Sequence, residues 1–206
     1  MEREDCRGQE PPKLKNRQKA YAIKKHGEEP MHEALYRISG VDLVAIDAIG
    51  VETVKVVISE YGPDLSRFPT EKQFVSHVTL APMVQELKAH YKPTSGGKAV
   101  KKKKRGSAST RVAEALRMAA LSMRHSPSAL GAYYRHIARR IAGDVAVFAT
   151  ARKLATLIYR MLRWGQPYVD EGAEAFENRY KQNRLKSLTA TAADLGFELT
   201  PKPSQA

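Results

Sequence analysis

The chain has 206 residues and a formal net charge of +13, with 35 Lys and Arg against 22 Asp and Glu, which favours an anionic partner. No run of about 18 apolar residues is present, so a membrane-spanning helix is excluded, and the first residues lack the apolar core of a signal peptide. The single cysteine, Cys6, excludes an internal disulfide framework and fits a reducing cytoplasm, and the six histidines lack metal-ligand spacing.

Residues 1–30 are polar and rich in Pro, Lys and Glu, with six cations between Lys13 and Lys25. This composition predicts a basic flexible linker or the frayed start of a helix.

Residues 31–62 are the first part of the chain with regular apolar spacing. They predict two short helices linked at Ala48-Ile49-Gly50, the second running from Glu52 to Tyr61. The apolar residues expected to face inward before the link are Leu35, Ile38, Leu43, Ile46 and Ile49.

This pair of helices resembles a helix-hairpin-helix, a module that offers loop amides to a DNA phosphate. On that pattern we expect Ile49 and Gly50 to lie at a phosphate. Ala48 stands where the module has its first glycine, and Ala accepts unusual dihedral angles less readily. A helical hairpin that only packs on the core is an equal alternative.

The next helix is expected to begin at Thr70, as N-cap, with Glu71 in its first turn. Another short helix is expected within residues 83–91. The apolar residues of the first of these helices are Phe74, Val75, Val78 and Leu80.

From Ser109 onward the sequence is almost continuously helical. Ser126-Pro127 predicts the start of a second helix in this region, and Gly143-Asp144 the start of a long third helix that Gly165 ends. A mixed helix follows within residues 170–196, and we expect Phe197 after it to pack on the bundle. The inward stripe of the first helix is Val112, Leu116, Ala119 and Met123.

The long helix is strongly amphipathic. Its expected inward residues are Val147, Ala151, Leu154, Ile158 and Met161. Its opposite side carries only cations: Arg152, Lys153, Arg160 and Arg163. A face of one sign repels itself unless an anion meets it, so we expect Arg152, Arg160 and Arg163 to contact DNA.

These elements predict an all-α fold, with a helix-hairpin-helix-like N-terminal part followed by a helical bundle with one long basic loop. The expected segments are a linker over residues 1–30, a helical domain over residues 31–200 and a tail over residues 201–206. Within the domain, the hairpin covers residues 31–62, the basic serine loop 88–111 and the bundle 109–196.

The basic loop centres on Ser95-Gly-Gly-Lys98. From Lys88 to Arg111 there are nine Lys or Arg and no Asp or Glu. Glycine permits close approach of the backbone to a ligand, and clustered ammonium groups attract phosphate. A Ser-Gly-Gly tripeptide is also ordinary turn composition. The sequence does not fit the phosphate-cradling nucleotide loop, and it lacks the companion motifs of the serine β-lactamases.

Several motifs occur in an order that resembles the C-terminal half of the bridge-RNA-guided serine/DEDD insertion-sequence transposases. The likeness runs over about residues 31–200. Its motifs include Ile38-Ser-Gly-Val-Asp-Leu, Glu60-Tyr-Gly, Ser95-Gly-Gly-Lys, Ser128-Ala-Leu-Gly-Ala-Tyr-Tyr-Arg and Ala151-Arg-Lys-Leu-Ala.

The resemblance implies that Ser95 attacks a DNA phosphodiester and forms a covalent phosphoserine link. It also implies a RuvC-like domain that supplies acidic residues and Mg²⁺, so we expect this chain to bind no cofactor itself. Nothing ahead of residue 31 matches that domain, and we expect a truncated or separately encoded C-terminal half that cleaves poorly alone. Residues 83–91 depart from the family pattern.

The partners that the resemblance implies are DNA, a guide RNA and further copies of the chain, in a prokaryotic cytoplasm near the nucleoid. Lys98 and Arg111 are candidates for stabilising developing charge. The residues expected to hold the strand electrostatically are Lys101, Lys102, Lys103, Lys104 and Arg105. Two alternatives stay open: a non-enzymatic helix-hairpin-helix binder of DNA or RNA, and a bundle whose charge serves only solubility.

Overall fold

The computed structural model describes residues 10–80, 94–95, 98–99 and 110–200. The fold is all-α, as predicted, with a two-residue strand pair, β1 (Thr94–Ser95) and β2 (Lys98–Ala99). The α-helices are α1 (Arg17–Lys25), α2 (Glu29–Ser39), α3 (Val51–Tyr61), α4 (Glu71–His77), α5 (Thr110–Ser122), α6 (Ala129–Arg140), α7 (Gly143–Trp164) and α8 (Gly172–Asp194). Two short 3-10 helices are η1 (Leu43–Ala45) and η3 (Met123–His125).

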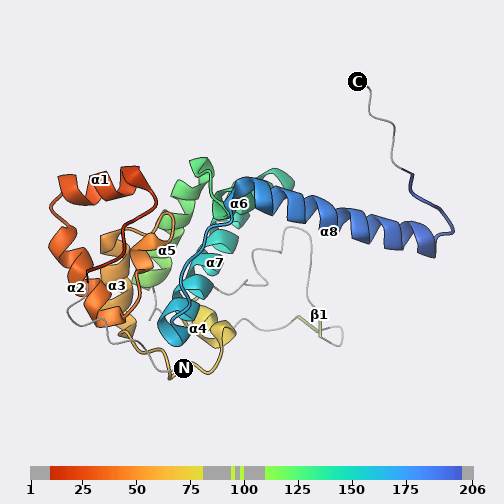
Figure 1. Ribbon diagram of the computed structural model, residues 1–206. Coiled ribbons are helices and arrows are strands. Elements are labelled where there is room, and N and C mark those ends of the chain that lie inside the picture. Colours follow the sequence, from red (N-terminus) through yellow and green to blue (C-terminus); the bar gives the residue numbers. More distant parts are fainter. Residues whose placement is uncertain (1–9, 81–93, 96–97, 100–109, 201–206) are drawn as a thin grey trace.

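Helix α7 forms the centre of the bundle (Figure 1). It packs against α4, α5 and α6, and α5 in turn packs against α3. The inward residues predicted for α7 lie in or against the core, and Leu154, Ile158 and Met161 are buried. Gly165 ends the helix in the left-handed conformation, with φ of 65°, as expected of a glycine at this position.

Part of the predicted linker is a helix. Residues Arg17–Lys25 form α1, whose Asn16 caps the helix by accepting a hydrogen bond from the Lys19 amide. Ile23 is buried in the core. Of the two alternatives predicted for this segment, Arg17–Lys25 form a helix, which Ile23 and the half-buried Lys19 attach to the residues that follow.

The hairpin region contains α2, η1 and α3 in succession. Ile46 and Ile49 are fully buried, as predicted, but Ile38 is 55% exposed. Ile38 was expected inside because it follows Leu35 at helical spacing. Helix α2 ends at Ser39, whose hydroxyl donates to the Leu35 carbonyl at 2.7 Å.

Helix α4 begins as predicted. The Thr70 hydroxyl accepts a hydrogen bond from the Gln73 amide, and Phe74 is buried. The buried Tyr159 hydroxyl of α7 donates to the Phe68 carbonyl at 2.6 Å, which fixes the turn before α4. The helix expected within residues 83–91 lies outside the described residues.

Helix α6 begins two residues later than predicted. Its N-cap is Ser128, whose hydroxyl accepts from the Gly131 amide at 3.1 Å, so Pro127 precedes the cap. The Ser126 hydroxyl instead donates to Asp47 at 3.1 Å and ties the hairpin to the bundle. Ser126 thus has a capping side chain but uses it for a tertiary contact.

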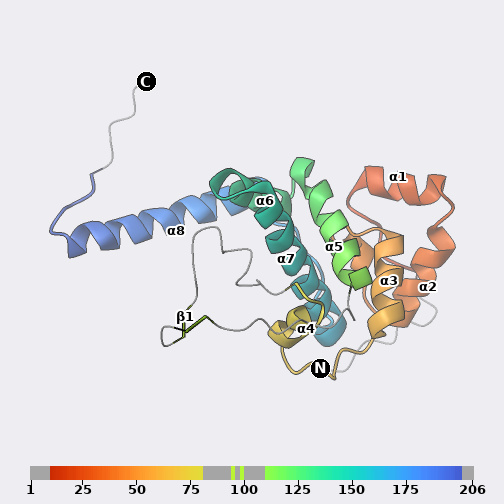
Figure 2. The ribbon, with the colours of Figure 1, turned by 180° about the vertical axis from the view of Figure 1, so that it is seen from behind.

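Helix α8 projects from the bundle, and the two opposite views agree (Figure 1 and Figure 2). None of its residues is buried. Phe197, which follows it, is 71% exposed, so the expectation that this ring packs on the bundle is wrong. Among the described helices, none combines the length and apolarity needed to cross a bilayer.

Candidate nucleic-acid interface

Ser95 and Lys98 face each other in the short strand pair. Strands β1 and β2 are antiparallel, and their register pairs Ser95 with Lys98 and Thr94 with Ala99. The backbone therefore places the predicted nucleophile and the predicted charge-stabilising residue at one rung. The predicted strand-holding residues 101–105 lie outside the described part of the chain.

Arg111 lies in the first turn of α5, with its side chain 73% exposed. Its Nε atom is 3.7 Å from the Glu60 carboxylate on α3. An exposed pair at this separation contributes little to stability, so the guanidinium can exchange this partner for a phosphate.

The cations predicted for the outer side of α7 differ in environment. Arg160 is bound to Glu71 of α4 by two hydrogen bonds, of 2.8 and 3.2 Å. The hydrogen bond from Arg160 lowers the pKa of Glu71, and the pair joins α4 to α7. Arg163 is exposed and Arg152 is half-buried. The charge of Arg160 is thus already balanced within the fold.

The link between η1 and α3 has an unusual backbone. Ala48 has φ of +64°, a left-handed conformation, and Gly50 is the N-cap of α3 without a side-chain cap. The Ile49 side chain is fully buried and its amide donates to the Ile46 carbonyl at 3.1 Å, so neither is free to contact a phosphate. Asp47 places a carboxylate directly beside this link, which opposes the approach of an anion.

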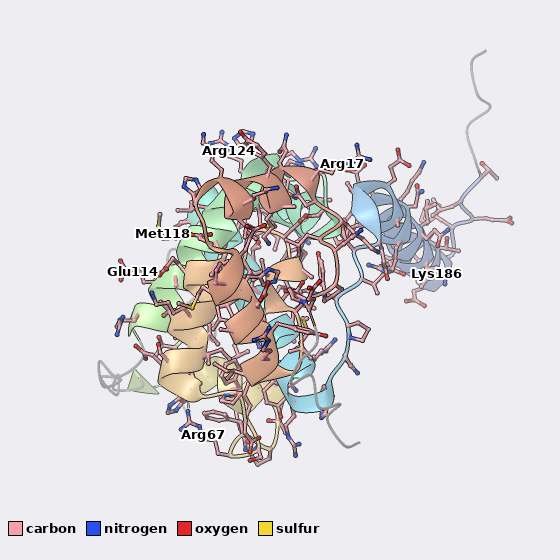
Figure 3. The ribbon with its side chains drawn as sticks, turned by 60° about the vertical axis from the view of Figure 1, so that its left-hand side comes forward. Arg17, Arg67, Glu114, Met118, Arg124 and Lys186 are labelled. Atoms are coloured by element: carbon pink, nitrogen blue, oxygen red, sulfur yellow. The ribbon has the colours of Figure 1, made fainter. Side chains whose placement is uncertain are left out.

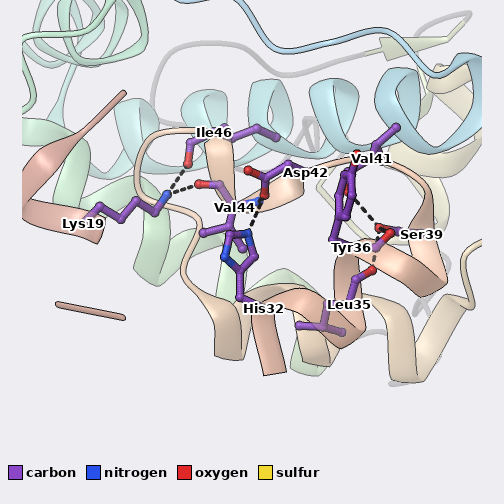
Figure 4. A network of polar contacts seen from close by, with 9 residues as sticks. All are labelled: Lys19, His32, Leu35, Tyr36, Ser39, Val41, Asp42, Val44 and Ile46. Atoms are coloured by element: carbon purple, nitrogen blue, oxygen red, sulfur yellow. Dashed lines mark hydrogen bonds and ion pairs between the residues drawn. The ribbon is translucent and has the colours of Figure 1, made fainter. Parts of the chain in front are cut away.

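Lys19 of α1 forms hydrogen bonds to the backbone just before this link (Figure 4). Its ammonium group donates to the carbonyl oxygens of Val44 and of Ile46, the latter at 2.7 Å. Burial lowers the pKa of Lys19 to about 8, against the opposing effect of Asp47 and Asp42. From the sequence, Lys19 is expected only as one of the cations of a linker. Its spacing of four residues from the buried Ile23 is the signal that would have placed it inward.

A buried hydrogen bond between a histidine and a carboxylate lies near this link. His32 of α2 lies 2.9 Å from Asp42, whose carboxylate also accepts the Val44 amide at 3.0 Å (Figure 4). Across residues 10–80, 94–95, 98–99 and 110–200, no cluster of three or more His, Cys, Asp or Glu side chains is arranged to hold a metal ion.

A second basic region, which the sequence did not predict, lies where α6 meets α8. Arg139 and Arg140 end α6, and Arg184 of α8 acts on the same histidine, His136. Only the contact between these two helices, which are far apart in sequence, brings these cations together.

Comparison with protein families gives one match, which begins at Gly40, after α2, and ends within α6. Residues 40–135 match the transposase IS116/IS110/IS902 family. This stretch contains the η1–α3 link, the Ser95–Lys98 strand pair, Arg111 and the capped start of α6. The match supports a transposase domain here. No curated protein and no solved structure matches the chain.

Proposed function

We propose that this chain is the DNA-joining domain of an insertion-element transposase, with Ser95 as nucleophile. The observation that carries the proposal is the family match over residues 40–135, because that stretch contains the serine loop. The net charge of +13 supports a nucleic-acid partner. The backbone register that pairs Ser95 with Lys98 supports the assignment of both residues to one site.

The proposed reaction is a phosphoryl transfer. The Ser95 Oγ forms a bond to a DNA phosphorus, the bond from that phosphorus to one DNA oxygen breaks, and the leaving oxygen takes up a proton while serine loses one. Lys98 and Arg111 stabilise the negative charge that develops on the phosphoryl oxygens. Attack by the freed DNA oxygen on the phosphoserine link reverses the step and rejoins a strand.

A serine hydroxyl is a weak nucleophile that needs a base. The proposal assigns the acidic residues and Mg²⁺ to a RuvC-like domain outside these 206 residues, in keeping with the resemblance. The guide RNA and the assembly of several copies belong to the same proposal. We therefore expect the chain alone to bind DNA and to transfer strands inefficiently.

A second candidate function is non-enzymatic binding through the helix-hairpin-helix-like part. The left-handed Ala48 and the uncapped amides that follow Gly50 favour it. The carboxylate of Asp47 beside the link argues against a strong phosphate site there.

A strand-transfer assay with element-end DNA, Mg²⁺ and the RuvC-like domain of the same element tests the proposal. Ser95→Ala should reduce transfer to background, and Lys98→Ala should reduce its rate by about a hundredfold, as for other charge-stabilising groups. Thr94→Val, the neighbouring hydroxyl in β1, is the matched control and should retain transfer. If the wild type binds DNA but Ser95→Ala changes no step, the second candidate replaces the first.

A further inference from the structure

Helices α6 and α8 meet along a seam of rings. The Tyr133 ring of α6 contacts Phe176 of α8 edge to face, with centroids 6.1 Å apart. One turn along α6, the His136 ring lies 4.0 Å from the Tyr180 ring of α8. The entry into α8 is fixed by Asp170, which accepts a hydrogen bond from the Ala129 amide at 3.0 Å. The first half of α8 is therefore held firmly on α6.

Helix α6 brings only cations to this seam, whereas α8 carries Glu174 and Glu177 around Phe176 and only cations from residue 178 to residue 193. Helix α6 contains three arginines and no acidic residue. On α8, residues 178–193 contain four cations and no Asp or Glu. One of these, Arg179, is paired with Glu171 at 2.5 Å. The three other α8 cations of this stretch are Lys181, Arg184 and Lys186, and Figure 3 shows Lys186 on the projecting part of the helix.

Arginines of both helices act on the charge state of His136. The pKa of His136 is lowered, first by burial and then by Arg139, Arg140 and Arg184. All three charged groups that shift it are cations, two on its own helix and one on α8. Among the ion pairs of the described residues, none involves Arg139, Arg140 or Arg184. Cations gathered from two helices without a carboxylate repel one another unless an anion lies among them.

We propose that the α6–α8 seam, defined by Arg139, Arg140, Arg184 and the His136–Tyr180 ring pair, binds the phosphodiester backbone of a nucleic acid. The surface uses none of the residues of the serine loop, so it is a second contact in addition to the proposed cleavage site. Helix α8 is about 34 Å long at 1.5 Å per residue, long enough to follow a backbone beyond the bundle. The half-exposed Tyr180 ring adds an aromatic surface next to the proposed phosphate contacts.

Equilibrium binding tests this surface in the full chain. The triple variant Arg139→Gln, Arg140→Gln, Arg184→Gln should weaken binding on the order of tenfold at moderate salt, and the log–log salt slope should decrease by about two to three. The probes are a DNA duplex, a DNA single strand and an RNA single strand of one sequence. The probe that loses most affinity identifies the strand that occupies the seam.

The matched control removes the same charge from α1, on the opposite side of the bundle from α8 (Figure 1). Arg17→Gln, Lys24→Gln, Lys25→Gln are three exposed positions, and this variant should bind with nearly wild-type affinity. Equal losses in both triple variants would overturn the proposal, because they would show an effect of net charge alone. Circular dichroism of each variant reports whether the helices are retained.

The titration of His136 provides a readout that does not depend on the variants' folding. A phosphate bound among the three arginines offsets their charge and should raise the pKa of His136, so binding should strengthen as pH falls through the titration. Proton NMR of wild-type chain with and without oligonucleotide measures this shift. An unchanged His136 pKa at saturating oligonucleotide would place the bound strand elsewhere and would refute the seam as its site.

Discussion

Ala48 and Thr79 are the non-glycine residues of the described chain that have a left-handed backbone, with φ of 64° and 62°. An L-residue with a Cβ atom adopts this conformation at a cost of about 1 kcal/mol or more. At Ala48 the surrounding contacts impose it: Ile49 is buried on one side, and Ser126 holds Asp47 on the other. The hairpin is thus strained at one residue and stabilised by its neighbours.

Replacing Ala48 with glycine should relieve this strain. We expect Ala48→Gly to raise the free energy of unfolding by about 0.5–1 kcal/mol. This is the net value, because glycine relieves the backbone strain but also increases the conformational entropy of the unfolded chain. The half-buried Ala45 in η1 is the control, and Ala45→Gly should destabilise by a similar amount. Urea denaturation measures both. Destabilisation by Ala48→Gly would show that the methyl contact outweighs the strain.

Lys19 gives the stability a pH dependence of known sign. The pKa of Lys19 is lowered to about 8 in the fold from 10.5, so between these values the unfolded chain binds more protons. The free energy of unfolding should therefore rise as pH increases from about 8 to 10, by about 2 kcal/mol at most. Above pH 10 the raised pKa values of Tyr133 and Tyr168 act in the opposite direction.

Urea denaturation at several pH values between 8 and 10 checks the effect of Lys19. The Lys19→Gln variant should lose the rise, and Lys25→Gln, an exposed lysine of the same helix, should keep it. A wild-type profile that is flat or falling over this interval would contradict a buried, charged Lys19.

At the junction of α5 and α6, Gly131 leaves no room for a larger side chain. A Cβ atom added at Gly131 would lie 2.2 Å from the Ser126 carbonyl oxygen and 3.1 Å from the Met123 carbonyl oxygen. Both obstacles are backbone atoms, so α6 has to move to relieve the overlap. The glycine sets how closely α6 follows η3.

We expect Gly131→Ala to destabilise the protein by about 2 kcal/mol or more, because overpacking here displaces a helix. Gly143, the first residue of α7, has open space around it, so Gly143→Ala is the control and should be neutral or slightly stabilising. Thermal unfolding compares the two. Equal melting temperatures would mean that α6 moves away at no cost.

The sequence predicted the elements whose pattern is local and failed where tertiary contacts decide. Helix α7 has regular apolar spacing and a terminal glycine, and both of its ends were correct. Helix α1 has a charged surface and is attached by Ile23 and Lys19, and the four-residue spacing of these two is its only local sign of an inward face. Phe197 is apolar and follows a helix, yet α8 leaves the bundle before reaching it.

For the molecule as a whole, the positive charge is spread over separate surfaces rather than gathered in one. Arg111 lies beside Glu60 of α3, and the α6–α8 seam is formed by two other helices. The sequence indicated the first from a local run of cations. It could not indicate the second, because Arg140 and Arg184 are far apart in the chain and meet only when α8 packs on α6.

Peptide mass spectrometry can detect the proposed covalent link between Ser95 and DNA. The chain is incubated with element-end DNA, Mg²⁺ and the RuvC-like domain, denatured, and digested with nuclease and protease. We expect a peptide containing residue 95 that carries the mass of a nucleotide phosphate in the wild type and in Thr94→Val, and no such peptide in Ser95→Ala. A nucleotide found on another residue, or strand transfer without any modified peptide, would contradict the proposed link.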